Sequence, residues 1–165
     1  MKSMMKKTAI TLMALLFATT LFYGQASAAP TRVGNIEIHK PWVRAVPPTS
    51  KTSAAYMGIL NHADSDDHLV SAESDIAKAV ELHNVRKKDG MMEMYQVKSI
   101  GIPAKGKQKL RPGSYHVMLI GLNRQPKEGE IIEVKLNFMH AGSVTIKAPV
   151  KKGGMMKKMM MHNMQ

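Results

Sequence analysis

The amino-acid sequence predicts an all-β protein of the sandwich type, followed by a disordered C-terminal tail. Short runs rich in Val, Ile, Tyr and Leu recur between turn signals, which is the pattern expected for a β-sandwich. Residues 132–138 (IEVKLNF) alternate between apolar and polar side chains, as in a strand with one buried face. The chain shows no long amphipathic helical stripe, so these observations favour strands throughout the globular part.

The expected strands cover residues 36–39, 54–61, 68–71, 79–85, 91–97, 116–119, 131–138 and 143–149. Clusters of Pro, Gly, Asp and Asn lie between these runs and supply the backbone angles that turns need. A short helical turn is expected over residues 74–80. We expect Trp42, the single tryptophan, to anchor the core.

The N-terminus has the order of features typical of a secretory signal. Three lysines precede residue 8, an apolar run covers residues 9–22, and Ala26-Ser27-Ala28 provides small residues for a signal peptidase. The alternative is an uncleaved membrane anchor, but the apolar run is shorter than the about 20 residues of a spanning helix. We therefore expect cleavage after Ala28 and a periplasmic protein. Its parts are a signal at 1–28, a sandwich domain at 29–150 and a tail at 151–165.

Composition excludes several function classes. The net charge is +12, but the basic residues are scattered and only 5% of residues are aromatic, so we expect no nucleic-acid binding and at most weak association with membrane surfaces. Cysteine is absent, which rules out disulfides, thiolate metal sites and blue-copper centres. Nucleophile-elbow, phosphate-loop and H-E-x-x-H motifs are also absent, so we expect a protein that is not an enzyme.

Methionine is abundant instead, with 16 residues in the chain. His116 and Met118 are two residues apart on an expected strand, so their side chains project from the same face, while Val117 between them faces the core. A four-residue loop at 87–90 would pair Arg86 with Met91 and so place His83 directly opposite Met94. Register is an inference here, and a slip would separate that pair.

Two imidazoles and two thioethers form a soft, neutral donor set that favours Cu(I) over Zn(II) or hard cations. Spacing alone leaves a second interpretation open, in which these methionines only fill gaps in packing. Met92 shares a face with Met94 and could substitute for it. Four other histidines lack a soft partner at strand spacing, and we expect them at the surface or in turns: His39, His62, His68 and His140.

The spacing of these four residues resembles a known signature. His83, Met94, His116 and Met118 match H-x10-M-x21-H-x-M, the metal-binding motif of periplasmic copper chaperones of the PCu(A)C family. The surrounding segments are similar too: PWVRA at 41–45 resembles W-x-R-A, KTSAAY at 51–56 resembles T-x-A-A-Y, and LRPGSYHVML at 110–119 resembles L-x-P-G-G-Y-H-x-M-L. The likeness extends over about residues 34–150, with Ser114 where the family often has Gly.

The resemblance implies a cupredoxin-like Greek-key β-sandwich that binds one Cu(I) through those four side chains. It also implies delivery of copper to a partner, typically the dinuclear copper site of cytochrome c oxidase or another assembly factor. Two alternatives stay open: a copper-dependent redox protein that assists oxidase assembly, and a copper-scavenging or tolerance protein. The third class of function that we consider is a secreted β-domain that binds no metal.

The tail, KKGGMMKKMMMHNMQ, carries six Met, four Lys and one His. We expect it to be disordered without a ligand because it has little to bury. A second, weaker copper site is expected from Met160, Met161, His162 and Met164, holding Cu(II) through His162 or a second Cu(I). The lysines oppose cation binding and could instead favour anionic lipid.

Overall fold

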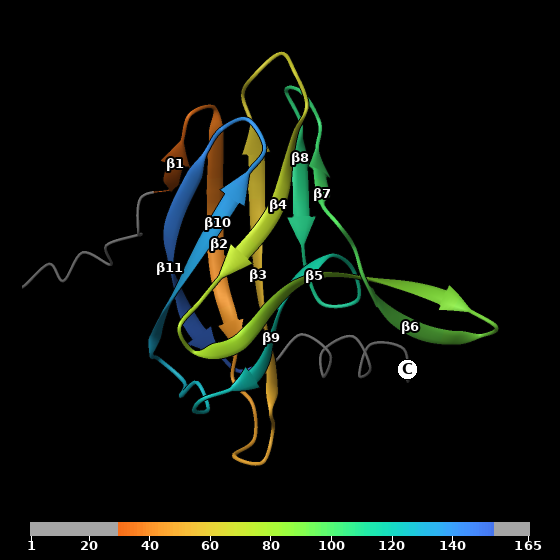
Figure 1. Ribbon diagram of the computed structural model, residues 1–165, viewed down its shortest axis with the longest axis vertical. Coiled ribbons are helices and arrows are strands. Elements are labelled where there is room, and N and C mark those ends of the chain that lie inside the picture. Colours follow the sequence, from red (N-terminus) through yellow and green to blue (C-terminus); the bar gives the residue numbers. More distant parts are fainter. Residues whose placement is uncertain (1–29, 154–165) are drawn as a thin grey trace, which may run out of the picture.

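The structure, a computed structural model, describes residues 30–153, and the predicted signal and residues 154–165 lie outside this range. The described residues form strands joined by turns, so the predicted all-β class is confirmed (Figure 1). The strands are β1 Thr31–Val33, β2 Ile36–Arg44, β3 Thr52–Asn61, β4 Asp67–Glu73, β5 Ala77–Lys88, β6 Met91–Gln96, β7 Ile100–Ile102, β8 Lys107–Leu110, β9 His116–Leu122, β10 Ile131–Phe138 and β11 Ser143–Lys151.

The strands form two layers that share β11. One layer has the order β6-β5-β9-β3-β2, with β1 paired to β2 and β8 paired to β3. The other has the order β11-β10-β4-β7. The parallel pairing of Val150 with Val43 joins β11 to β2, and the remaining pairs are antiparallel. The predicted β-sandwich is therefore confirmed.

Alternation along the strands divides inward from outward side chains. On β10, Ile132, Val134 and Leu136 are buried, while the residues between them face solvent or are partly covered. On β9, Val117 and Leu119 are fully buried in the same core. Burying apolar surface at about 25 cal/mol per Å² drives this arrangement, and the core has to stabilise a chain that has no disulfide.

Two expectations about local structure were wrong. Residues 74–77 form a tight turn in which the Ala77 N–H donates to the Ser74 carbonyl, but no helical turn follows. From Ala77 onward the segment belongs to β5, where Ala77 and Ala79 pair with Leu122 and Ile120 of β9. Trp42 does not anchor the core: it is half-buried on the outer face, where its ring lies 4.6 Å from that of Tyr56. Within residues 30–153 there is no helix with the length and apolar character needed to cross a bilayer.

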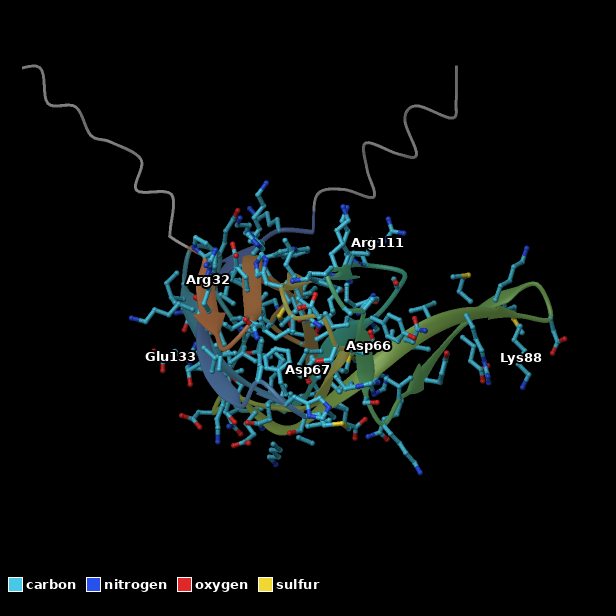
Figure 2. All side chains as sticks on the ribbon, turned by 90° about the horizontal axis from the view of Figure 1, so that it is seen from above. Arg32, Asp66, Asp67, Lys88, Arg111 and Glu133 are labelled. Carbon is cyan, nitrogen blue, oxygen red and sulfur yellow. The ribbon has the colours of Figure 1, made fainter. Side chains whose placement is uncertain are left out.

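The β5–β6 hairpin extends away from the body of the sandwich, and β6 pairs with β5 alone (Figure 1). Lys88 lies near its far end (Figure 2). Asp89 and Gly90 form a two-residue turn with φ values of +51° and +82°, so Lys88 pairs with Met91. Asp-Gly suits such a turn because both central residues need positive φ. The predicted four-residue loop at 87–90 is therefore wrong.

Substituting alanine for Gly90 tests this turn. We expect Gly90→Ala to destabilise the hairpin by about 1–2 kcal/mol, because a Cβ is unfavourable at positive φ. Faster amide hydrogen exchange in β5 and β6 reports the effect. Gly58→Ala is the matched control, since its new Cβ would meet His39 only at ordinary van der Waals distances. Equal exchange rates in the hairpins of both variants would contradict the turn assignment.

Candidate metal site

The candidate site lies on the outer face of the layer that contains β9. Val117 points into the core, and this forces His116 and Met118 on either side of it to the opposite face. Leu82 of β5 is likewise in the core, so its neighbour His83 projects outward beside them. The predicted placement of His116 and Met118 on one face, with Val117 inward, is confirmed.

His83 and His116 form a direct cross-strand pair between β5 and β9. Their ring centroids are 5.8 Å apart with a tilt of 41°. This pair was not predicted from the sequence, where His83 was expected opposite Met94 and His116 beside Met118. Two imidazoles from neighbouring strands are thus held close together by the sheet itself.

The His116 imidazole is in the form that binds a metal. It is 3% exposed, and its Nδ1 donates a hydrogen bond to the Ser114 carbonyl at 2.8 Å. A carbonyl can only accept, so Nε2 carries the lone pair. Burial lowers the pKa of His116 below its ordinary value, against the opposing effect of the Ser114 hydrogen bond. The nearby charges of His83 and Arg44 lower this pKa further. The ring is therefore kept neutral, as a ligand must be.

The His83 imidazole also has one committed and one available nitrogen. Nε2 lies 2.8 Å from Glu81 Oε2, and the side chain of His83 is 15% exposed. Nδ1 is buried and has no hydrogen-bond partner among the described residues. A buried, unpaired nitrogen is costly unless something binds it. Three other buried nitrogens among the described residues also lack a hydrogen-bond partner: His39 Nε2, Arg44 Nε and His68 Nδ1. The nitrogen of His83 differs in that its ring pairs with the ring of His116 across β5 and β9.

Met118 lies beside this pair on β9. It is the cross-strand partner of Ala54 on one side and Glu81 on the other, and it is partly exposed. Its thioether follows His116 by two residues on a single rigid strand. The structure thus brings His83, His116 and Met118 to adjacent positions on one face.

Met94 is placed differently from the prediction. His83 pairs with Gln96, and Met94 pairs with Val85, because the two-residue turn shifts the register by two positions. An even shift preserves the face, so Met94 still projects from the same side as His83, one step closer to the hairpin tip. Diagonal neighbours of this kind are about 7–8 Å apart. Met94 is 52% exposed, and Met92 on the same face is 65% exposed.

Sequence reasoning missed the residues that surround His116. Trp42, Tyr56, His116 and His83 form a row across four strands, in which Tyr56 and His116 have ring centroids 6.1 Å apart. The guanidinium of Arg44 lies 5.3 Å from the Tyr56 ring centroid. The WVR and AAY segments carried this signal, but only the strand order shows that they meet the histidines.

The other histidines form no competing site. His39 and His62 each place Nε2 2.9 Å from the buried Glu37, and His140 is exposed. His39 and His68 are half-buried on β2 and β4, so the expectation that they lie at the surface or in turns was wrong. Within residues 30–153, no group of three or more His, Cys, Asp or Glu side chains could hold a metal ion. A groove of about 480 Å³ between β2, β3 and β8 contains none of the four candidate ligands. The candidate site instead combines two imidazoles with thioethers.

The donor set decides which metal the site suits. Imidazole nitrogen and thioether sulfur are neutral, and sulfur is soft, so the arrangement favours Cu(I) over hard divalent cations. The unpaired Nδ1 of His83 and the available Nε2 of His116 are the two imidazole nitrogens that could bind such an ion. Three donors are adjacent, and the fourth, Met94, lies on the edge strand β6, which pairs with β5 alone.

Comparison with known proteins agrees with the fold and indicates the family. A family model described as LpqE-like matches residues 36–150. Lipoprotein Lxx21020 of Leifsonia xyli subsp. xyli (strain CTCB07) is 32% identical over 117 residues, which cover 70% of this chain and 69% of that protein.

Among solved structures, the copper-bound PCuAC domain from PmoF2 matches with a TM-score of 0.65 and 29% identity, over 74% of this chain and 97% of that domain. CuI-DR1885 from Deinococcus radiodurans matches with a TM-score of 0.60 and 33% identity, over 78% and 85%. The chain therefore belongs to the LpqE-like family and has the fold of PCuAC domains.

Proposed function

We propose that this protein is a Cu(I)-binding metallochaperone, with copper as its cargo. The observation that carries the proposal is the His83–His116 pair on the outer face, in which each ring has one committed nitrogen and one nitrogen available to a metal. Met118 supplies a thioether beside the pair. The ligands are then His83, Met94, His116 and Met118, in the spacing H-x10-M-x21-H-x-M.

The related structures support this proposal from outside. Both the PmoF2 domain and DR1885 were solved with copper bound, at 29% and 33% identity to this chain. Neutral ligands leave the site with only the charge of the ion, and thioethers are weak donors that a partner can displace. Such a site suits carriage and transfer of Cu(I) rather than catalysis.

The site is open to solvent at Met94. Half of its side chain is exposed, whereas His116 is almost fully buried. We infer that binding of copper draws the Met94 thioether over Val85 toward the histidines, and that loss of this contact begins release. A partner would approach from the hairpin, since the other three ligands lie in the body of the sheet.

The acceptor we propose is the dinuclear copper site of cytochrome c oxidase or another assembly factor. Incubating the Cu(I) form with the copper-free soluble domain of that oxidase subunit should transfer the metal. Retention of copper by a protein that still yields it to a chelator would favour the scavenging or tolerance role. Redox turnover by the copper form would favour the assisting redox protein.

Export follows from the N-terminal pattern, and membership in a family described as lipoprotein-like agrees with an exported protein. This chain has no cysteine, so it has no thiol to which a lipid could be attached. We therefore propose a periplasmic protein that is cleaved after Ala28.

The start of the tail lies close to the site. Lys151, the last residue of β11, pairs with Arg44, and a Cβ on Gly153 would lie 3.5 Å from Arg44 Nε. Arg44 also lies over Tyr56, next to His116 in the row of rings. This exit point supports a role for the tail in capturing copper, as Cu(II) or a second Cu(I), and passing it to the rigid site. The donors would be Met160, Met161, His162 and Met164.

Replacing single ligands tests the main site. We expect His83→Ala, His116→Ala and Met118→Leu each to weaken Cu(I) binding at least about tenfold, since even the loss of an outer partner of a ligand costs about 10–100-fold. Met94→Leu should cost less, because this side chain is half-exposed. Competition with a chromophoric Cu(I) chelator under anaerobic conditions measures each affinity.

Met139→Leu is the matched control for Met94→Leu. Met139 is 55% exposed and lies outside the site. The Met139→Leu variant should therefore bind Cu(I) with the affinity of the wild type. Leucine conserves volume at these positions, so the fold is retained. Equal binding by the wild type and the three variants expected to bind most weakly would reject the site.

Truncation after Gly153 tests the tail while keeping β11 intact. The full chain should bind additional copper weakly and load the main site faster than the truncated chain. A second variant with Leu or Gln at the four tail donors, and with all lysines kept, separates ligation from charge. The same stoichiometry and capture rate in all three proteins would refute a role for the tail in copper capture.

A further inference from the structure

Glu81 lies two residues before His83 on β5, so the two side chains project from the same outer face. The carboxylate Oε2 is 2.8 Å from His83 Nε2. Among residues 30–153, His83 is the only ion-pair or hydrogen-bond partner of the Glu81 side chain. The side chain of Glu81 is 32% exposed, so it is partly covered and not free in solvent.

This contact selects one tautomer of the imidazole. A carboxylate accepts hydrogen bonds, so Nε2 of His83 carries the hydrogen, and in the neutral ring Nδ1 then carries the lone pair. Nδ1 is the atom that is buried without a partner. On His116 the assignment is reversed, because Nδ1 donates to Ser114 and Nε2 remains available.

We propose that Glu81 is a positioning residue that holds His83 in the Nε2–H tautomer and thereby assigns Nδ1 to the metal. The two histidines would then bind Cu(I) through different nitrogens, His83 through Nδ1 and His116 through Nε2. This inference rests on the proposed function for the identity of the ligand. Carboxylates that accept from a ligating histidine fix its orientation and raise its basicity in other metal sites.

Glu81 is not itself a ligand in this proposal. Within the described residues, it forms no group with the two histidines that could hold a metal through three such side chains. A hard carboxylate is also a poor match for Cu(I). It instead lies beside two proposed ligands, His83 on the same strand and Met118 directly across on β9.

The test uses Glu81→Ala and Glu81→Gln in the otherwise complete chain. Long-range ¹H–¹⁵N spectra of the copper-free protein, recorded above the ordinary histidine pKa of about 6.5, report which nitrogen of His83 is protonated. We expect the Nε2–H form in the wild type and a tautomer mixture in Glu81→Ala. Glutamine should restore the wild-type spectrum, because its amide oxygen accepts the same hydrogen bond.

Cu(I) affinity provides the second readout. Glu81→Ala should bind about 10–100-fold more weakly than the wild type, and Glu81→Gln should recover most of that loss. Glu93→Ala is the control: Glu93 lies on β6 and pairs with Arg86, so its removal changes the charge equally without touching His83. Thermal unfolding of each variant confirms that it is folded.

The outcomes separate this inference from the proposed function. An unchanged His83 tautomer in Glu81→Ala, or an equal loss of affinity in Glu81→Ala and Glu93→Ala, overturns the positioning role while copper binding stands. A wild-type protein that binds no Cu(I) refutes the proposed function instead. The tautomer spectrum needs no copper, so in that case an Nδ1–H form in the wild type still overturns the inference.

Discussion

The alternation of side chains along β9 is the constraint on which the candidate site depends. Val117 is completely buried in the core, and a strand turns successive side chains to opposite faces. As long as Val117 packs in the core, the side chains of His116 and Met118 must project from the outer face. The same rule applied to Leu82 on β5 turns His83 to that outer face, where the register of β5 and β9 pairs it with His116. The hydrophobic core thus orients polar and sulfur-containing ligands that it does not contain.

This origin explains what could be predicted from the sequence. The face on which a side chain lies depends only on whether its position along the strand is odd or even. The placement of His116 and Met118 on one face could therefore be predicted from the apolar pattern around Val117. Met94 kept its face even though its partner was misjudged, because the Asp89–Gly90 turn shifted the register by an even number of residues. Strand existence and face depend on local composition, and each of the eight expected strands overlaps an observed strand. The short strands β1, β7 and β8 were not predicted, because three or four residues carry little pattern of their own.

Contacts between distant strands could not be predicted in the same way. The pairing of His83 with His116 requires knowing that β5 and β9 are neighbours, which depends on the order of strands in the layer. The roles of Glu81 and Tyr56 also depend on side-chain orientation. Trp42 was assigned to the core on composition alone, whereas strand order stacks it on Tyr56 outside the core. Long-range pairing, not local propensity, decides these positions.

The site combines a rigid half with an accessible half. His116 is buried and held by Ser114, and His83 is held by Glu81, so these rings are oriented before a metal arrives. Met94 lies on a hairpin strand with a single neighbour and remains half-exposed. In the proposed function, preorganised nitrogen donors would provide selectivity and affinity, while an exposed thioether would give a partner access. A carrier of copper would need both properties.

X-ray absorption spectroscopy of the Cu(I)-loaded protein tests the central claim most directly, since it counts the nitrogen and sulfur atoms around the metal. A site formed by His83, Met94, His116 and Met118 predicts two nitrogen and two sulfur scatterers per copper in a chain truncated after Gly153, which removes the tail donors. A first shell of nitrogen and oxygen alone, without sulfur, would contradict it.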